Sequence, residues 1–387
     1  MRCSLPRPWR PPRVPPDGGG RQGGAELTGR KARRSGSTTI VDVAREAGVS
    51  VSTAARVIRG SDATVDASLK DRVHAAAASL SYVPNVMARN LRAGAPTLVG
   101  LVVGDMLDPF YGEIAEAITE QAETMHSMLA VVCNMHRDPE LELKYCRRLL
   151  EYRVGGLILA GGGFHQWSHR DRLAELTAQM VASGVVVTTL TPRGIDVPAF
   201  HVDNEEVGRL AAEELLSAGH RRIGILIGTQ QNDVTWQRIR GMEDALVRAG
   251  AEYHITHVEY TSPAAEAGVA SLFTAYPGIT GVIAGSYAMS MGIFRWLRAS
   301  GRSVPNDVSV VGIGNTRIAE WMSPKLTAIN LKLDQFGCAA LSYIAAKSGR
   351  SEPTAPPSTM PEIVHGESVS RVSQGPHAGG GQTRLSE

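Results

Sequence analysis

Three short stretches between residues 39 and 80 carry apolar residues at helical spacing. In the first stretch the apolar positions follow the i, i+3, i+4, i+7 rule and are Ile40, Val43, Ala44 and Ala47. Thr39 precedes this stretch and Asp42 lies three residues later, which is the spacing of a capping box. The pattern predicts a helix that begins after Thr39 and is ended by Gly48.

Two more helical patterns follow. Ser50 can cap a second helix over residues 51–59, and Asp66 can cap a third. The candidate inner positions are Val51, Ala54, Val57 and Ile58 in the second helix and Leu69, Val73, Ala76, Ala77 and Leu80 in the third. Two short helices joined by a tight turn with glycine, and followed by a supporting helix, predict an all-α helix-turn-helix head over residues 37–83.

From Thr97 onward, apolar runs alternate with helical stretches. The runs cover residues 97–103, 128–133, 154–160, 185–190, 223–227, 281–284 and 308–313. Continuous runs of this kind between helices predict parallel sheets that are covered on both faces. Seven runs exceed one comfortable sheet, so we expect two doubly wound α/β lobes over residues 97–369, with a change of lobe near residues 201–204. Ligands bind at the carboxyl ends of the strands in such sheets, which predicts a cleft site.

The two ends of the chain have a different composition. Residues 1–36 are rich in Pro, Gly and Arg, and both they and residues 370–387 lack periodicity, which predicts disorder. We interpret the first segment either as a basic arm or as sequence upstream of the true start. It has no apolar core of a signal peptide, and no stretch approaches about 20 uninterrupted apolar residues, so we expect neither export nor a membrane span. The four cysteines lack metal-site spacing, which favours free thiols in a reducing cytoplasm.

Charge is distributed unevenly along the chain. The net charge is +2, but residues 1–92 hold 16 Lys and Arg against 7 Asp and Glu, so the remainder carries −7. A basic head on an acidic body favours a polyanionic partner. Between residues 37 and 92 the balance is only 7 to 5, so most of the excess lies in the first 36 residues.

Eight segments resemble the lactose-repressor (LacI/GalR) family of bacterial transcriptional regulators. They are TTIVDVAREAGVSVSTAARVIRG (38–60), YVPNVMARNLRAG (82–94), LVGLVVGDMLDPFYGEI (98–114), FHVDN (200–204), SAGHRRIGILIG (217–228), VPNDVSVVGIGN (304–315), PKLTAI (324–329) and EIVHGESV (362–369). The resemblance implies a homodimeric regulator, most simply a repressor, that binds operator DNA in the cytoplasm, at the nucleoid. Its second domain is expected to be periplasmic-binding-protein-like and to sense a sugar or sugar acid.

The resemblance also implies which residues meet DNA. Val51 and Ser52 fall where the family reads bases, although Val51 is alternatively a core residue, while Thr53 and Arg56 should reach phosphate or a neighbouring base. Residues 84–96 match the family's hinge and linker, which implies a helix that folds on the operator with its twin, brought close by Ala88. Leu91 either inserts into the minor groove as a wedge or packs as an ordinary helix residue. The full set of predicted DNA-contacting residues is Thr39, Ser50, Val51, Ser52, Thr53, Arg56, Asn85, Ala88 and Leu91.

A second set of residues aligns with the family's effector pocket. It consists of Phe110, Tyr111, Trp236, Arg238, Ser286 and Asn315. Arg238 matches an arginine that clamps a ligand hydroxyl or carboxylate, or else it is a surface charge. Trp236 either stacks on the ligand or packs in the core. Gly314 stands where the family often has an aspartate that accepts from sugar hydroxyls, which favours an acidic sugar.

Two other classes of protein share parts of this pattern. A periplasmic sugar-binding protein would need a signal peptide and no DNA-binding head. A nucleotide-dependent enzyme would need a phosphate-binding loop, and neither a GxGxxG nor a Walker pattern follows a strand here. We therefore expect no enzymatic activity, no cofactor and no metal. The partners expected are double-stranded DNA, a small-molecule effector and a second copy of the chain.

Overall fold

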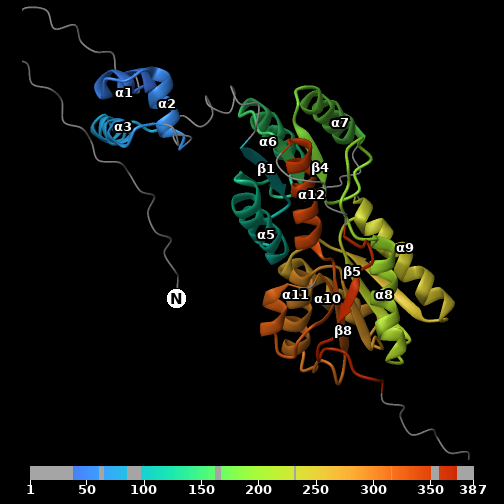
Figure 1. The fold of residues 1–387 in the computed structure, drawn as a ribbon. Coiled ribbons are helices and arrows are strands. Elements are labelled where there is room, and N and C mark those ends of the chain that lie inside the picture. Colours follow the sequence, from blue (N-terminus) through green and yellow to red (C-terminus); the bar gives the residue numbers. More distant parts are fainter. Residues whose placement is uncertain are drawn as a thin grey trace, which may run out of the picture. The chain divides into compact units, whose positions relative to one another are not determined.

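The computed structural model describes residues 38–60, 65–84, 97–161, 167–230, 232–314, 316–349 and 357–372, without the side chains of Trp167 and Glu320. The chain divides into two compact units between Val86 and Met87. Each unit is described by itself (Figure 1). Asn85, Ala88, Leu91 and Asn315, which the sequence singles out, lie outside the described residues.

The first unit is a bundle of three short helices. They are α1 (Ile40–Ala47), α2 (Val51–Ile58) and α3 (Ala67–Ser79). The predicted caps are present: Thr39 and Asp42 form a capping box on α1, and Ser50 and Asp66 cap α2 and α3. Gly48 ends α1 with φ +61°, a backbone conformation that favours glycine. The core of this three-helix unit contains Val43, Ala44, Ala47, Ala54, Val57, Val73 and Ala76.

Val51 corrects one of the sequence predictions. It does not join this core, because its side chain is 43% exposed. Val51 is the first residue of α2, directly after the cap, and the inward face of that helix is formed by Ala54 and Val57. The side chain of Val51 is therefore available at the surface.

The second unit contains two sheets, each covered by helices on both faces. The four-stranded sheet has the order β2-β1-β3-β4 and the six-stranded sheet the order β10-β9-β8-β7-β5-β6. All neighbouring strands are parallel except β10 and β9. This arrangement confirms the predicted pair of doubly wound lobes.

The first lobe begins with β1 (Leu98–Val103), α5 (Pro109–His126) and β2 (Leu129–Asn134). It continues through α6 (Pro139–Glu151), β3 (Gly156–Leu159), α7 (Trp167–Ala182) and β4 (Val186–Thr189). The second lobe contains α8 (Asn204–Ser217), β5 (Arg222–Ile227), α9 (Asp233–Arg248), β6 (Glu252–His257), α10 (Ser262–Ala275), β7 (Gly281–Ala284), α11 (Tyr287–Ala299), β8 (Ser309–Ile313), η1 (Arg317–Trp321), β9 (Thr327–Asn330) and β10 (Glu362–Val364).

The chain crosses between the lobes three times, whereas the sequence predicts one crossing near residues 201–204. After β9 the chain returns to the first lobe as α12 (Leu333–Lys347), which packs against α5, β3 and β4 (Figure 1). It then comes back to the second sheet as β10. The crossing segments are joined by backbone hydrogen bonds, since Asp203 N donates to Thr359 O at 2.8 Å and Glu362 pairs with Asn330.

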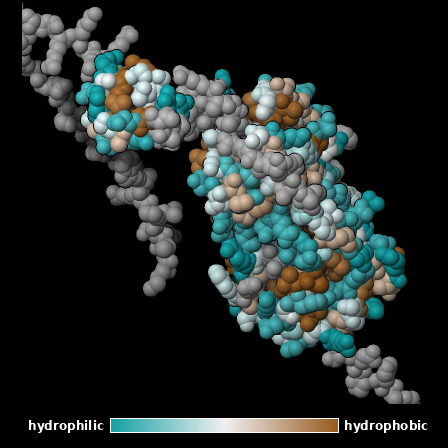
Figure 2. Space-filling view, in the orientation of Figure 1, coloured by the Kyte–Doolittle hydropathy of each residue, from teal (hydrophilic) through white to brown (hydrophobic). Residues whose placement is uncertain are grey.

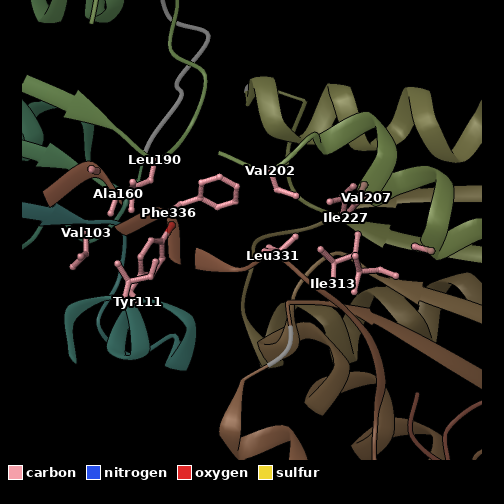
Figure 3. Close-up of a cluster of buried hydrophobic side chains, with 14 of the residues drawn as sticks. Val103, Tyr111, Ala160, Leu190, Val202, Val207, Ile227, Ile313, Leu331 and Phe336 are labelled. Atoms are coloured by element: carbon pink, nitrogen blue, oxygen red, sulfur yellow. The ribbon is translucent and has the colours of Figure 1, made fainter. Parts of the chain in front are cut away.

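One continuous apolar core runs through both lobes. It joins the face of the first sheet covered by α5 and α12 to the face of the second sheet covered by α8 and α9. Figure 3 shows its two sides, with Tyr111 and Phe336 on one and Ile227 and Ile313 on the other. Shared burial of apolar surface holds the lobes together.

Candidate functional site

The start of α2 presents a polar surface. Ser50 Oγ accepts a hydrogen bond from Thr53 N at 3.1 Å and lies 2.8 Å from both Ser52 Oγ and Thr53 Oγ1. Ser52 and Arg56 are exposed, as is Val51. Short hydroxyls and one exposed methyl-bearing side chain at the helix start, with the Arg56 guanidinium in the last turn, are suited to contacts with base edges and phosphates.

Thr39 is engaged in the cap of α1. Its hydroxyl donates to Asp42 Oδ2 at 2.7 Å, and the hydrogen bonds from Thr39 lower the pKa of that exposed carboxyl. Thr39 is itself exposed, and so remains accessible to a phosphate.

A cavity of about 90 Å³ lies at the carboxyl ends of the strands of the second unit. Its lining residues lie at or just after the carboxyl ends of strands in both sheets, namely β1–β4 and β5–β9. Strand order reverses between β1 and β3 in the first sheet and between β5 and β7 in the second, and residues that follow all four of these strands line the cavity. The helices that follow begin here, capped by Asp108, Asn232 and Ser286. A doubly wound sheet binds its ligands at this point.

Arg238 enters this cavity from α9 and is buried, with 8% of its surface exposed. Its Nε donates to Asn204 Oδ1 at 3.1 Å and its Nη1 to Gly285 O at 3.3 Å. Burial lowers the pKa of the guanidinium from its ordinary value. A buried cation held in one orientation at a cavity wall is suited to clamping a polar ligand, and the alternative of a surface charge is excluded.

Two glycines allow α8 and α9 to approach closely enough for this arrangement. A Cβ on Gly208 would lie 1.9 Å from Arg238 O, and one on Gly241 would lie 1.8 Å from Glu205 O. The two helices therefore meet backbone to backbone, and this contact places Arg238 beside Asn204.

Phe110 and Tyr111 both line the cavity, as the sequence predicts. Their rings meet edge to face at a centroid distance of 4.9 Å. Burial raises the pKa of the Tyr111 hydroxyl. Ser286 also lines the cavity, but its Oγ accepts from Met289 N at 3.3 Å as the cap of α11.

Trp236 lies outside the cavity lining. It is 45% exposed, and its Nε1 donates to Gln230 O at 2.8 Å. It does not pack in the core, and its contact with an effector stays a prediction. Trp236 precedes Arg238 by two residues on a helix, so the two side chains point in different directions.

The polar cavity residues that the sequence did not single out include Arg137, Thr191 and Tyr260. Arg137 follows β2, and its Nη2 donates to Asp108 Oδ2 at 3.3 Å. Its guanidinium carbon lies 5.9 Å from the ring centroid of Tyr111 and 5.7 Å from that of Tyr260. His136 and Arg137 both have left-handed backbone conformations, with φ of +50° and +57°. Such consecutive strained residues are typical of functional sites.

The polar groups of the cavity are only partly satisfied. Among the described residues, Arg137 Nε and Thr191 Oγ1 are buried without a hydrogen-bond partner. Burial raises the pKa of Asp108, and the charge of Arg137 opposes this shift. Arg137 and Arg238 are the cations of the described lining and Asp108 its anion, so the cavity carries a net positive charge.

Comparison with known proteins identifies the two units. Residues 39–85 match the model of bacterial regulatory proteins, lacI family, and residues 97–366 match that of periplasmic binding proteins and the sugar binding domain of the LacI family. The chain belongs to the LacI family. It is a DNA-binding transcriptional regulator with a periplasmic-binding-protein-like, sugar-binding domain.

Individual LacI-family members agree with this assignment over most of their length. The regulator GalR of Escherichia coli K12 is 30% identical over 340 residues, covering 87% of this chain and 96% of GalR. The regulator CelR of Thermobifida fusca is 33% identical over 316 residues, covering 77% of this chain and 88% of CelR. These relatives are transcriptional regulators.

Solved LacI-family structures show the same fold. The lac repressor dimer bound to operator and the anti-inducer ONPF superposes with a TM-score of 0.73 at 23% identity, covering 86% of this chain and 99% of that one. A CelR–cellobiose complex gives 0.61 at 27% identity, with the same coverage. Within the described parts of this LacI-family chain, no helix is long and apolar enough to cross a membrane, and no cluster of three or more His, Cys, Asp or Glu is arranged to hold a metal.

Proposed function

We propose that this LacI-family regulator is a homodimeric repressor whose effector is an anionic carbohydrate, a sugar acid. The effector lies in the cleft cavity, and its occupancy changes the affinity for operator DNA. A ligand shifts such an equilibrium only by its differential affinity for the two states of the protein.

The net positive charge of the cavity carries the assignment of an acidic effector. Arg238 is buried, and Arg137 keeps a buried Nε without a partner among the described residues, while the Asp108 carboxylate is already paired with Arg137. The buried Nε of Arg137 requires a hydrogen-bonded acceptor, and a carboxylate ligand supplies a charged one. Gly314 adds no carboxylate to the site.

The surfaces of both units support the remaining parts of the proposal. In the first unit, Val51 and Ser52 at the start of α2 and Arg56 in its last turn are exposed and can meet the major groove. Asn85, Ala88 and Leu91 would form the hinge in the minor groove. In the second unit, apolar residues reach the surface in patches (Figure 2). Met125 and Leu129, beside and at the start of the edge strand β2, are exposed apolar side chains and are suited to a dimer contact.

Ligand binding to the full chain tests the effector class. Calorimetry should compare gluconate and galacturonate with the neutral sugars glucose and galactose. We expect one of the acids to bind, and the affinity for the neutral sugars to be at least about tenfold lower. Arg137→Met and Arg238→Met should lose this preference. Arg240→Met is the matched control, because Arg240 lies on the same helix as Arg238 but pairs with Glu205 at the surface. Tighter binding of a neutral sugar, unchanged by Arg137→Met, would contradict the acidic assignment.

The regulatory direction needs a separate measurement. Operator affinity of the purified protein, measured by fluorescence anisotropy, should change when the acid is added. A reporter under the operator should be expressed more strongly when the gene for this chain is deleted. Lower expression in the deletion strain would make the protein an activator.

A further inference from the structure

A second, smaller cavity of about 40 Å³ adjoins the effector cavity. The two cavities share three wall residues: Phe110, Leu331 and Leu333. The remaining lining of the smaller cavity consists of Glu113, Ile114, Gly314, Thr316, Asn330, Lys332 and Asp334. It therefore lies between α5 of the first lobe and the ends of β8 and β9 of the second. Its volume holds about three water molecules.

Thr316 indicates that this space is built for a polar group. It occupies the N-cap position of η1, where a threonine hydroxyl normally accepts from the helix backbone. Here the hydroxyl makes no capping bond, the residue is only 2% exposed, and Oγ1 has no hydrogen-bond partner among the described residues. A buried hydroxyl without a partner destabilises the fold unless a bound group satisfies it.

Donors are supplied by the start of α12. Its N-cap residue, Lys332, has a left-handed backbone with φ +49° and makes no side-chain cap in the described structure. The first N–H groups of a helix lack partners within that helix. Lys332 and the first residues of α12 line the cavity, so backbone donors face it, while the Lys332 ammonium pairs with Glu362, which is not part of the lining.

Acceptors are supplied by Glu113 and Asp334. Glu113 Oε1 accepts from Arg317 N at 2.5 Å, and the Arg317 guanidinium pairs with Glu116, so this carboxylate is fixed between the lobes. Burial raises the pKa of Glu113, and the nearby charge of Asp334 adds to that shift. A carboxylate ligand would be repelled by these two residues, and an ammonium ligand would find unpaired backbone donors at the start of α12, to which it offers no acceptor. A hydroxyl group both donates and accepts and carries no charge, so hydroxyls fit this mixed lining best.

We propose that the smaller cavity is a subsite for the hydroxylated end of the effector, whose acidic end lies between Arg137 and Arg238. The effector is then an extended polyhydroxy acid that passes Phe110, as a six-carbon aldonic acid can, and not a compact acid that fills one cavity. This inference rests on the proposed function.

Two acids of different length test the subsite by calorimetry on the full chain. Gluconate has six carbons and erythronate has four. The unaltered protein should bind gluconate at least about tenfold more tightly, the amount typical of one buried hydrogen bond or more. Thr316→Val should remove this difference without lowering the melting temperature, and Thr316→Ser should keep it. Thr177→Val is the control, because Thr177 is equally buried but its hydroxyl bonds to Leu173 O within α7.

The outcomes separate the subsite from the acidic effector. If Thr316→Val leaves the affinities for both acids unchanged, the cavity holds water only and the subsite is wrong. If neither acid binds, glucitol and erythritol make the same comparison. A Thr316-dependent preference for glucitol would keep the subsite and overturn the acidic effector. Binding of none of the four compounds would overturn both proposals.

Discussion

Arg238 Nε donates to Asn204 Oδ1, and the two residues come from α9 and α8, which meet at Gly241 and Gly208. Asn204 is buried and orients the guanidinium without lining the cavity. We predict that Asn204→Ala lowers effector affinity about tenfold, because the cation loses its fixed geometry.

Arg238→Ala should abolish the effector response altogether. Both variants should bind operator normally without effector, as anisotropy can show; unaltered ligand affinity in Arg238→Ala would remove Arg238 from the site.

Arg56 and Ser52 should have separable roles on DNA. We predict that Arg56→Ala weakens binding to operator and to random DNA alike and reduces the salt dependence by about one ion, because phosphate contacts carry the sequence-independent part of affinity. Ser52→Ala should instead change which base is preferred. Titrations at several salt concentrations against an operator library measure both effects. Altered base preference in Arg56→Ala with an unchanged salt slope would reverse the two assignments.

Val51 and Val57 form a matched pair on α2. Val57 is 2% exposed in the core, so Val57→Ala should lower the unfolding free energy of the head by roughly 1–3 kcal/mol. Val51→Ala should change it by less than about 0.5 kcal/mol, as for other surface positions, while reducing operator affinity. Thermal unfolding of the head and operator binding by both variants check the pair. A large stability loss in Val51→Ala would place Val51 in the core after all.

The first lobe contains a buried carboxylate away from the cleft. Glu142 Oε1 accepts from Arg193 Nη1 at 2.7 Å, and its Oε2 lies 3.0 Å from His169 Nε2. Burial raises the pKa of Glu142, but Arg193 and His169 outweigh this and leave it lowered. A lowered folded-state pKa stabilises the protein above the unfolded-state pKa of about 4.3, and this contribution is lost as the pH falls through the folded value.

Glu142→Gln should therefore destabilise the protein at neutral pH by about 3–5 kcal/mol, since it leaves Arg193 buried without its counter-ion. The difference from the unaltered protein should shrink as the pH falls below about 4. Urea unfolding across this range measures the effect. A difference that stays constant with pH would mean that the charge of Glu142 contributes nothing.

Leu91 tests the proposed hinge, which lies outside the described residues. If Leu91 inserts between base steps, Leu91→Ala should reduce operator affinity and bending while leaving the melting temperature of the second unit unchanged. Unstacking a base step costs a few kcal/mol, which the inserted side chain must help to offset. A core leucine would instead lose about 2–5 kcal/mol of folding stability. A lower melting temperature with normal bending would contradict the wedge.

The sequence predicted those elements whose pattern is local. The caps of the three head helices and seven of the ten strands in the described part of the chain follow from neighbouring residues. The strand β6, with the sequence EYHITH, was not predicted, because it is a half-buried edge strand that contains polar residues. Tyr260 follows β6 and was therefore not recognised as a cavity residue. The return of α12 to the first lobe depends on packing against α5, some 200 residues earlier, and no local pattern reports such a contact.

Part of the cleft lining was predictable because its residues lie next to local motifs. Phe110, Tyr111 and Arg238 lie next to recognisable motifs, and the structure brings them together. Arg137 could have been found, because it follows a predicted strand at its carboxyl end. The surroundings of Trp236 could not be predicted from the sequence. Trp236 and Arg238 are two residues apart on one helix, so their side chains point to different surroundings, and the sequence does not say which of them faces the cavity.

Three covalent connections between the lobes limit how they can move. The connecting segments are hydrogen-bonded to one another, through Asp203 and Thr359 and through Asn330 and Glu362. Two lobes that are joined by adjacent connecting segments rotate most easily about those segments, as about a hinge. Sliding of one lobe along the other would distort all three segments at once. We therefore expect a ligand in the cleft to change mainly the angle between the two lobes.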